Sequence, residues 1–131
     1  MYRRMTQHVS VHLRPFDLTP EQFSVLFQLY KDDGIKQKEL AARTFKDQPT
    51  MTRILDVLLR KGLIQKEMCD SDRRAFLITI TKNGKALMDQ AIPAEEKAIA
   101  QVFEGFDSTQ LEQLKQMLLQ CCENIQRHTN E

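Results

Sequence analysis

Residues 47–81 constrain the fold of this chain more than any other segment. The first part has the apolar spacing of a helix, which begins after Asp47 as a capping residue and closes at Gly62. The second part predicts two strands, at 64–68 and at 76–81, joined by a polar turn. A helix followed directly by a β-hairpin favours a winged helix-turn-helix.

The segment before this one predicts the other half of the helix-turn-helix. Residues 36–44 form a short helix with Leu40 and Ala41 as its buried contacts, and residues 45–46 form the turn. Two short helices that are joined by a tight turn and a capping residue make a helix-turn-helix.

Two more helices are predicted towards the N-terminus. Residues 1–13 are weakly amphipathic and end at Pro15. Because such a helix is too short to be stable alone, it must pack on another element. Thr19 and Gln22 then have the spacing of a capping box, so a helix begins there and stops at Gly34.

The C-terminal third predicts two long helices. Thr81 caps the first, which runs to about Phe106 with a kink at Pro93. The last helix starts at Asp107 or Ser108. Its apolar residues recur at intervals of three and four, as in a short coiled-coil seam: Leu111, Leu114, Leu118, Cys121 and Ile125.

Composition and charge exclude several classes of protein. A chain of 131 residues predicts one domain, or one domain with an oligomerisation arm. It has no apolar run of the roughly 18 residues that span a membrane, and we read no signal peptide, so we expect a cytoplasmic protein. The net charge is +1, but residues 36–74 hold ten Lys/Arg against six Asp/Glu, whereas residues 83–131 hold four against eight. The middle of the chain is therefore the part suited to phosphates, unless the clustering is due to chance.

The order of these elements, with five short motifs, resembles the MarR family of bacterial regulators over nearly the whole chain. The motifs are LTPEQF at 18–23, TMTRILD at 50–56, KGLI at 61–64, DRR at 72–74 and LITITKNG at 77–84. Each motif is weak alone, and their order is the more specific feature.

The resemblance implies a mainly α fold with a small β-hairpin wing, in a single domain over residues 1–131. Residues 18–82 would form a winged helix lobe that binds double-stranded DNA, and residues 1–17 and 83–131 would form the platform of a homodimer. Such a dimer reads a pseudo-palindromic promoter site, most often as a repressor. Family members often release DNA when a small aromatic compound binds, and the phenylalanines near that hinge (Phe16, Phe23 and Phe27) are explained equally well by core packing.

Four residues in the first turns of the 48–60 helix are candidates for DNA contact: Gln48, Thr50, Thr52 and Arg53. Amide, hydroxyl and guanidinium groups recognise base edges and phosphates, and the start of a helix adds backbone N–H donors. The alternative is that Thr50 only supports the helix cap and that Arg53 is a solvated surface charge. Lys36 and Lys38 suit phosphates and a solvated surface equally well.

Arg73 and Arg74 at the wing are candidates for the minor groove or for phosphates, with a solvated hairpin tip as the alternative. The resemblance implies that the second arginine of such a wing can pair with an acidic residue of the recognition helix. Asp56 matches that position, so we expect an orienting Asp56–Arg74 ion pair and a DNA contact from Arg73.

Two rival functions remain. A winged helix can bind another protein instead of DNA, although three arginines at 53, 73 and 74 argue against this interpretation. A redox sensor acting through Cys69 would need a low thiol pKa, which the neighbouring acidic residues disfavour. Cys121 and Cys122, being adjacent on a helix, are not expected to form a disulfide with each other.

No enzyme or cofactor is predicted. The chain has no glycine-rich phosphate loop, no nucleophile elbow and no Cys/His set with metal spacing. His8 and His12 lie one helical turn apart, but two ligands without a nearby carboxylate make a weak metal site.

Overall fold

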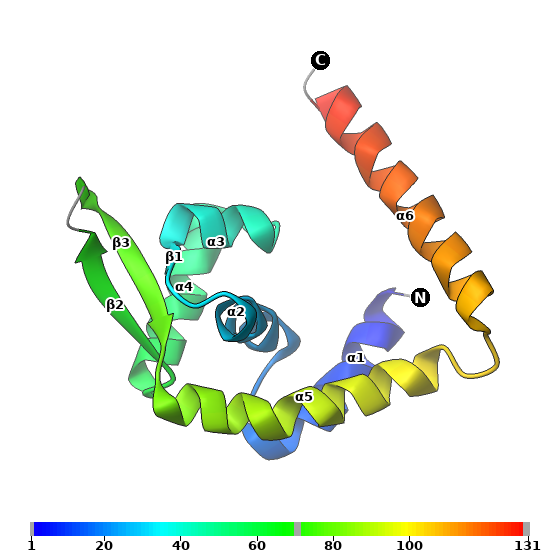
Figure 1. Ribbon diagram of the computed structural model, residues 1–131, viewed down its shortest axis with the longest axis horizontal. Helices are drawn as coiled ribbons and strands as arrows, with labels where there is room; N and C mark the ends of the chain where they lie inside the picture. Colours follow the sequence, from blue (N-terminus) through cyan, green and yellow to red (C-terminus); the bar gives the residue numbers. More distant parts are fainter. Residues whose placement is uncertain (1, 70–71, 130–131) are drawn as a thin grey trace. The chain divides into compact units, whose positions relative to one another are not determined.

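The computed structural model describes the backbone of residues 2–69 and 72–129, with the side chains of 3–68 and 75–129. It confirms the predicted mainly helical winged fold (Figure 1). The chain divides into two compact units, Met1–Ala98 and Ile99–Glu131, which are described separately below. The elements are α1 (Tyr2–Leu13), the 3₁₀ helix η1 (Arg14–Phe16), α2 (Pro20–Lys31), β1 (Ile35–Lys36), α3 (Gln37–Arg43), α4 (Gln48–Arg60), β2 (Ile64–Cys69), β3 (Asp72–Ile80), α5 (Lys82–Val102) and α6 (Ser108–Thr129).

The core of the first unit lies among α2, α3, α4 and the base of the hairpin. The predicted capping box of α2 is present, since Gln22 N donates to Thr19 Oγ1 (3.1 Å) and Thr19 N donates to Gln22 Oε1 (3.2 Å). Leu40 and Ala41 are buried in α3 as predicted. Residues that are completely or almost completely buried fill the space between the helices: Leu26, Leu29, Leu40, Met51, Leu55, Leu58, Ile78 and Met88.

The wing is part of a three-stranded antiparallel sheet with the order β1-β3-β2. β2 and β3 form the predicted hairpin, with Ile64 opposite Ile80 and Met68 opposite Phe76. β1 was not predicted, because two residues are too few to show an alternating pattern. It pairs Ile35 with Ile78, and this pairing ties the start of α3 to the wing.

The start of α5 packs tightly on the loop that joins α4 to β2. Thr81 N donates to Leu63 O (3.0 Å), and the Thr81 hydroxyl donates to Gly62 O (2.7 Å) and accepts from Gly84 N (3.0 Å). The last of these bonds is the predicted cap. The helix ends at Val102 rather than near Phe106. The chain leaves it through a turn in which Gly105 has a φ of +91°, a conformation that favours glycine.

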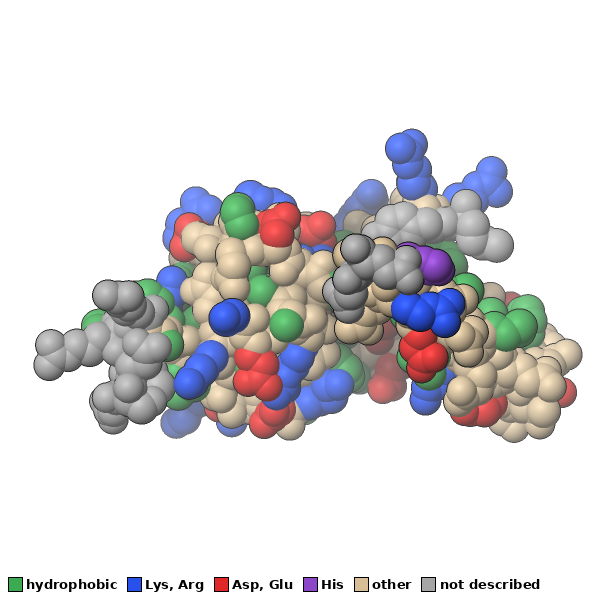
Figure 2. Space-filling view, turned by 90° about the horizontal axis from the view of Figure 1, so that it is seen from above, with side chains coloured by type: hydrophobic (Ala, Val, Ile, Leu, Met, Phe, Trp, Pro, Cys, Tyr) green, Lys and Arg blue, Asp and Glu red, His purple; other side chains and the backbone are tan. Residues whose placement is uncertain are grey.

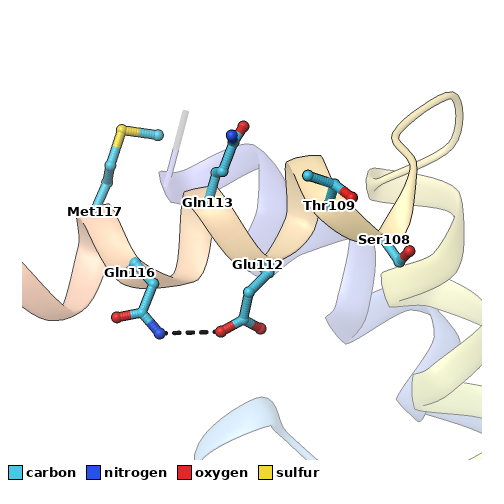
Figure 3. A pocket seen from close by; sticks show the side chains of 6 residues that line it. All are labelled: Ser108, Thr109, Glu112, Gln113, Gln116 and Met117. Carbon is cyan, nitrogen blue, oxygen red and sulfur yellow. Dashed lines mark hydrogen bonds between the residues drawn. The ribbon is translucent and has the colours of Figure 1, made fainter.

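The second unit consists of the last turn of α5, the turn that follows it and α6. Asp107 caps α6 as predicted and forms a capping box with Gln110 (2.8 and 2.9 Å). None of the residues of α6 is buried. On its first turns, Gln116 donates to Glu112 (3.0 Å) on one side of the helix, while Gln113 and Met117 project to another side (Figure 3). These side chains do not converge, so this stretch is an open helix surface rather than a ligand site.

The turn between α3 and α4 contains a strained residue. Phe45 has a φ of +56° although it is bulky, and its side chain is 93% exposed. An L-residue in this conformation costs about 1–2 kcal/mol, and the exposed ring gives up little packing when it is removed. We expect Phe45→Gly to raise the free energy of unfolding by about 1 kcal/mol, with Phe45→Asn in between, as measured by urea denaturation. A loss of stability in the glycine variant would contradict this prediction.

Candidate nucleic-acid interface

The N-terminus of α4 is held by Asp47. Its Oδ1 accepts a hydrogen bond from Thr50 N (2.8 Å), and Pro49 lies in the first turn of the helix. The hydrogen bonds from the Thr50 backbone and side chain, followed by the positive charge of Arg53, hold the pKa of Asp47 below its ordinary value. Asp47 therefore caps α4 and fixes the backbone from which the side chains of its first turns project.

A groove of about 570 Å³ lies between the first turns of α4 and the base of the wing. Among the described side chains, three lysines are the charged residues that line it, and no acidic residue does. It brings together the starts of α3 and α4 with both strands of the hairpin through Lys36, Gln37, Lys38, Gln48, Thr52, Lys66, Ala75 and Phe76. A concave surface with several cations and amide groups is suited to a polyanion.

The structure distributes the four candidates on α4 over two sides of the helix. Gln48 and Thr52 line the groove, where Gln37 Nε2 donates to Thr52 Oγ1 (3.1 Å). Thr50 is half-buried, and its N–H is used by the cap. Arg53 does not line the groove.

Arg53 lies at a second hollow, of about 430 Å³, formed by α1, the start of α2 and α4. The guanidinium Nη2 is 3.6 Å from Glu21 Oε2, and the Arg53 side chain is 67% exposed. An ion pair this open to water contributes little to stability, so Glu21 leaves Arg53 free to move to another anion. Lys46 lines the same hollow.

The wing candidates lie on β3. The backbone of Arg73 and Arg74 belongs to β3, but their side chains lie outside the described residues, as does the side chain of Cys69. The turn residues 70–71 also lie outside them. Asp56 is exposed on α4, one turn after Thr52. Its predicted pairing with Arg74 therefore stays a prediction.

Sequence reasoning missed four residues of the groove, namely Gln37, Lys66, Ala75 and Phe76. The Lys66 ammonium lies over the Phe76 ring, 4.4 Å from its centroid. The register puts Lys66 opposite Ile78, on the same face of the hairpin as the buried Ile64 and Ile80. The sequence does indicate that Ile64, Lys66 and Met68 share one face of a strand. Which way this face points follows only from the register of the two strands. Lys36 and Lys38, which the sequence left undecided, both line the groove.

The remaining candidates do not form a second site. His12 Nδ1 and His8 O are 3.0 Å apart, and among the described residues no group of three His, Cys, Asp or Glu is arranged to hold a metal ion. Phe23 is buried, and Phe16 and Phe27 pack against the core. Cys121 and Cys122 are exposed on α6. No helix in the described part of the chain is long and apolar enough to cross a membrane.

On the face of the winged lobe that Figure 2 draws, positive and negative side chains are mixed. Figure 2 shows Lys and Arg side chains at several places on this lobe, at the left of the view, with Asp and Glu side chains between them. On this face, therefore, the cations do not form one continuous basic surface.

The lowered pKa of Asp47 gives a pH-dependent prediction. Because the pKa is lower in the folded state, the stabilisation is complete above the ordinary pKa of Asp and is lost as the pH falls through the lowered value, below about pH 4. We expect Asp47→Asn, which keeps a capping side chain, to lose less stability than the wild type between neutral pH and about pH 2.5. Urea midpoints at a series of pH values measure this, and parallel losses in both proteins would argue against it.

Comparison with known proteins agrees with this geometry. The model of the MarR family matches residues 18–76. An HTH-type transcriptional regulator of Bacillus subtilis (strain 168), YhbI, is 25% identical over 117 residues, which are 89% of this chain and 76% of that protein.

Two solved structures show how far the likeness extends. CouR from Rhodococcus jostii RHA1, bound to p-coumaroyl-CoA, is 27% identical with a TM-score of 0.80, covering 88% of this chain and 80% of CouR. A mutant of MarR from E. coli in complex with operator DNA has a TM-score of 0.85 over 92% of this chain and 91% of MarR. At 23% identity the latter supports the fold alone. Together with the family match, these structures confirm the resemblance seen in the sequence.

Proposed function

We propose that this chain, whose residues 18–76 match the model of the MarR family, is a transcriptional regulator rather than an enzyme. In this proposal it binds a pseudo-palindromic promoter site in double-stranded DNA as a homodimer and acts as a repressor. In this proposal, α4 enters the major groove with Gln48, Thr50, Thr52 and Arg53 in its first turns. Arg73 and Arg74 of the wing contact the minor groove or the adjacent phosphates.

The observation that carries the proposal is the groove between α4 and the wing. It lies between the helix that would read bases and the wing that would contact the DNA backbone, and the charged residues that line it, in the part of the chain whose side chains are described, are lysines. Phosphate contacts fix the register of a protein on DNA, and side chains that reach base edges then supply specificity. The groove and the start of α4 supply both kinds of group within one lobe.

The homodimer is proposed from the apolar surface of the second unit. A hollow of about 420 Å³ on this unit is lined almost entirely by apolar side chains, namely those of Phe103, Leu111, Leu114, Leu118, Leu119 and Cys122, with Lys115. Leu118 is 56% exposed, and Ile125, further along the same seam, is 67% exposed. A second copy would cover this surface and residues 1–17, and a two-fold dimer matches a palindromic site. In this proposal residues 18–82 remain free to bind DNA.

Release by a small aromatic ligand is a further part of the proposal. CouR provides the precedent, as a structural relative that was crystallised with p-coumaroyl-CoA. We place regulation of this kind in a cytoplasmic protein, where both the promoter and a metabolite are accessible. Oxidation of Cys69 is the alternative signal, and thiol oxidation assays separate it from ligand binding.

The proposed Asp56–Arg74 pair gives a prediction opposite to that of simple electrostatics. Removing a negative charge near DNA normally strengthens binding. If Asp56 orients the wing arginine, Asp56→Ala should instead weaken binding to the specific site, which fluorescence anisotropy with a labelled duplex would measure. Unchanged or tighter binding would refute the orienting role.

The proposed function is tested by selecting fragments of the source genome with the purified protein and then titrating salt on the best site. We expect a pseudo-palindrome beside a promoter to be enriched, and the logarithm of the binding constant to fall steeply with the logarithm of the salt concentration. A folded dimer that enriches no fragment at low salt would overturn the proposal. It would favour a winged helix that binds another protein, for which an apolar interface would be insensitive to salt.

A further inference from the structure

We propose that Lys66 and Phe76 form a phosphate clamp, in which Lys66 binds one DNA phosphate on the strand that passes between the recognition helix and the wing, and the Phe76 ring holds its ammonium in place. This inference rests on the proposed DNA-binding function and adds a contact to it. Neither residue belongs to the recognition helix or to the tip of the wing, which are the parts predicted from the sequence to bind DNA.

The position of Lys66 follows from the register of the hairpin. Ile64, Lys66 and Met68 share one face of β2, opposite Ile80, Ile78 and Phe76 on β3. At the base of the hairpin this face is buried, with Ile64 and Ile80 in the core. Two residues further along β2, Lys66 lines the groove although its partner Ile78 is still buried, and on β3 the same face reaches the groove at Phe76. Lys66 therefore points to the side of the hairpin that faces α4, rather than to bulk solvent on the opposite side.

Among the described side chains, no anion lies near Lys66. None of these side chains places a carboxylate within 4.0 Å of its ammonium, and the described residues that line the groove include no carboxylate. Its described partner is the face of Phe76 at 4.4 Å. A ring face attracts a cation without neutralising it, so the ammonium keeps its charge and its donors for another ligand.

The exposure of Phe76 supports the same role. The ring is 38% exposed, at a place where Ile78 and Ile80 of the same strand face are buried. Because part of the Phe76 ring stays in water, its burial stabilises the fold less than the full burial of these neighbours does. Its contact with Lys66 fixes a long, flexible side chain that otherwise has many rotamers. A cation that is fixed before binding loses less entropy when a phosphate arrives.

The phosphate of a DNA strand is the occupant that fits the groove. Lys36 at the end of β1 and Lys38 in the first turn of α3 line the same groove, so its cations come from three different elements. Gln48 and Thr52 extend from α4, which would lie in the major groove. With α4 in the major groove, the DNA strand that borders this groove on the side of the wing would pass between α4 and the wing. Its phosphates would then contact Lys66.

The test compares Lys66→Gln with the matched control Lys97→Gln on α5, where the lysine is exposed and lines neither the groove nor the second hollow. Salt titrations are made with the best selected duplex and with an unrelated duplex. Each lost phosphate contact lowers the salt slope by about 0.9, so we expect a homodimer with Lys66→Gln to lose about 1.8, equally on both duplexes. The control should keep the wild-type slope.

Two Phe76 variants test the positioning role. Phe76→Leu keeps an apolar side chain but removes the ring face, and should weaken binding by roughly two- to fivefold per protomer. Phe76→Tyr keeps the ring and should therefore bind DNA as tightly as the wild type. In the Lys66→Gln background, the change to Leu should have no further effect, because the cation is already absent.

The inference fails if Lys66→Gln keeps the wild-type salt slope while the wild type binds DNA, or if Phe76→Leu weakens binding equally with and without Lys66. In either case the proposed function survives. If the wild-type protein itself shows no binding at low salt, the proposed function fails. Circular dichroism of each variant separates unfolding from loss of a contact.

Discussion

Replacing Arg53 by alanine should weaken binding to the specific DNA site by about 1–3 kcal/mol per half-site, which is roughly 5- to 150-fold. The guanidinium is 67% exposed near the start of α4, and its one described ionic partner, Glu21, is 3.6 Å away in an open ion pair. Such a pair contributes about 0–1 kcal/mol and is easily exchanged for a stronger partner. A planar guanidinium with five donors can form bidentate hydrogen bonds with a guanine edge or a phosphate.

A comparison of two further variants decides which role Arg53 has. Arg53→Lys keeps the charge but not the planar fork, so it should preserve binding to random DNA and lose specificity if Arg53 reads a base. The matched control is Arg60→Ala, an exposed arginine at the far end of the same helix. Electrophoretic mobility shifts with specific and scrambled duplexes measure both effects. If Arg53→Ala and Arg60→Ala reduce binding equally, Arg53 has no particular role in recognition.

Local signals in the sequence were sufficient for most of the helices and for the hairpin. Thr19 and Gln22 predicted a capping box, and both of its hydrogen bonds are present. Asp47 predicted the start of α4 and accepts from Thr50 N. These features depend on residues three positions apart, so the sequence contains all the information that determines them. The end of α5 was placed four residues too far, because Phe103 and Phe106 continue the apolar pattern into the turn.

The residues that line the groove could not be predicted from any single segment of the sequence. Lys66 faces α4 only because β2 pairs with β3 in one particular register, and a shift of one residue would turn it to the other face. β1 depends on a pairing between Ile35 and Ile78, which are far apart in the sequence. In the same way, Gln48 and Arg53 are close in the sequence, yet they belong to different hollows because α4 packs against the wing on one side and α2 on the other.

Gly84 is the position where a single methyl group should have the largest effect on stability. An added Cβ would lie 2.3 Å from the carbonyl oxygen of Leu63 and 2.7 Å from Ile80 Cγ1. The first neighbour is backbone, and it already accepts a hydrogen bond from Thr81 N (3.0 Å). It therefore cannot move without disturbing the junction that joins α4, the wing and α5. No rotamer change relieves a contact that is made by Cβ itself.

The expected result of Gly84→Ala is a loss of stability of about 1–3 kcal/mol or more, which reverses the usual order of these residues in helices. In a helix interior, alanine is normally about 1 kcal/mol better than glycine, so propensity alone predicts a gain. The matched control is Asn83→Ala, which changes the neighbouring, exposed residue of the same helix and should be neutral or slightly stabilising. Urea denaturation of both variants gives the two free energies.

DNA binding by Gly84→Ala adds a second measurement to the first. Leu63 lies between the end of α4 and the start of β2, so a displacement there changes the angle between the recognition helix and the wing. We expect affinity for the specific site to fall even at temperatures where the variant is fully folded, because the α4 side chains and the wing can no longer reach their grooves together. A variant that is as stable as the wild type and binds DNA normally would show that the junction yields to the methyl group. The close approach of α5 to the α4–β2 loop would then not be what sets the wing in place.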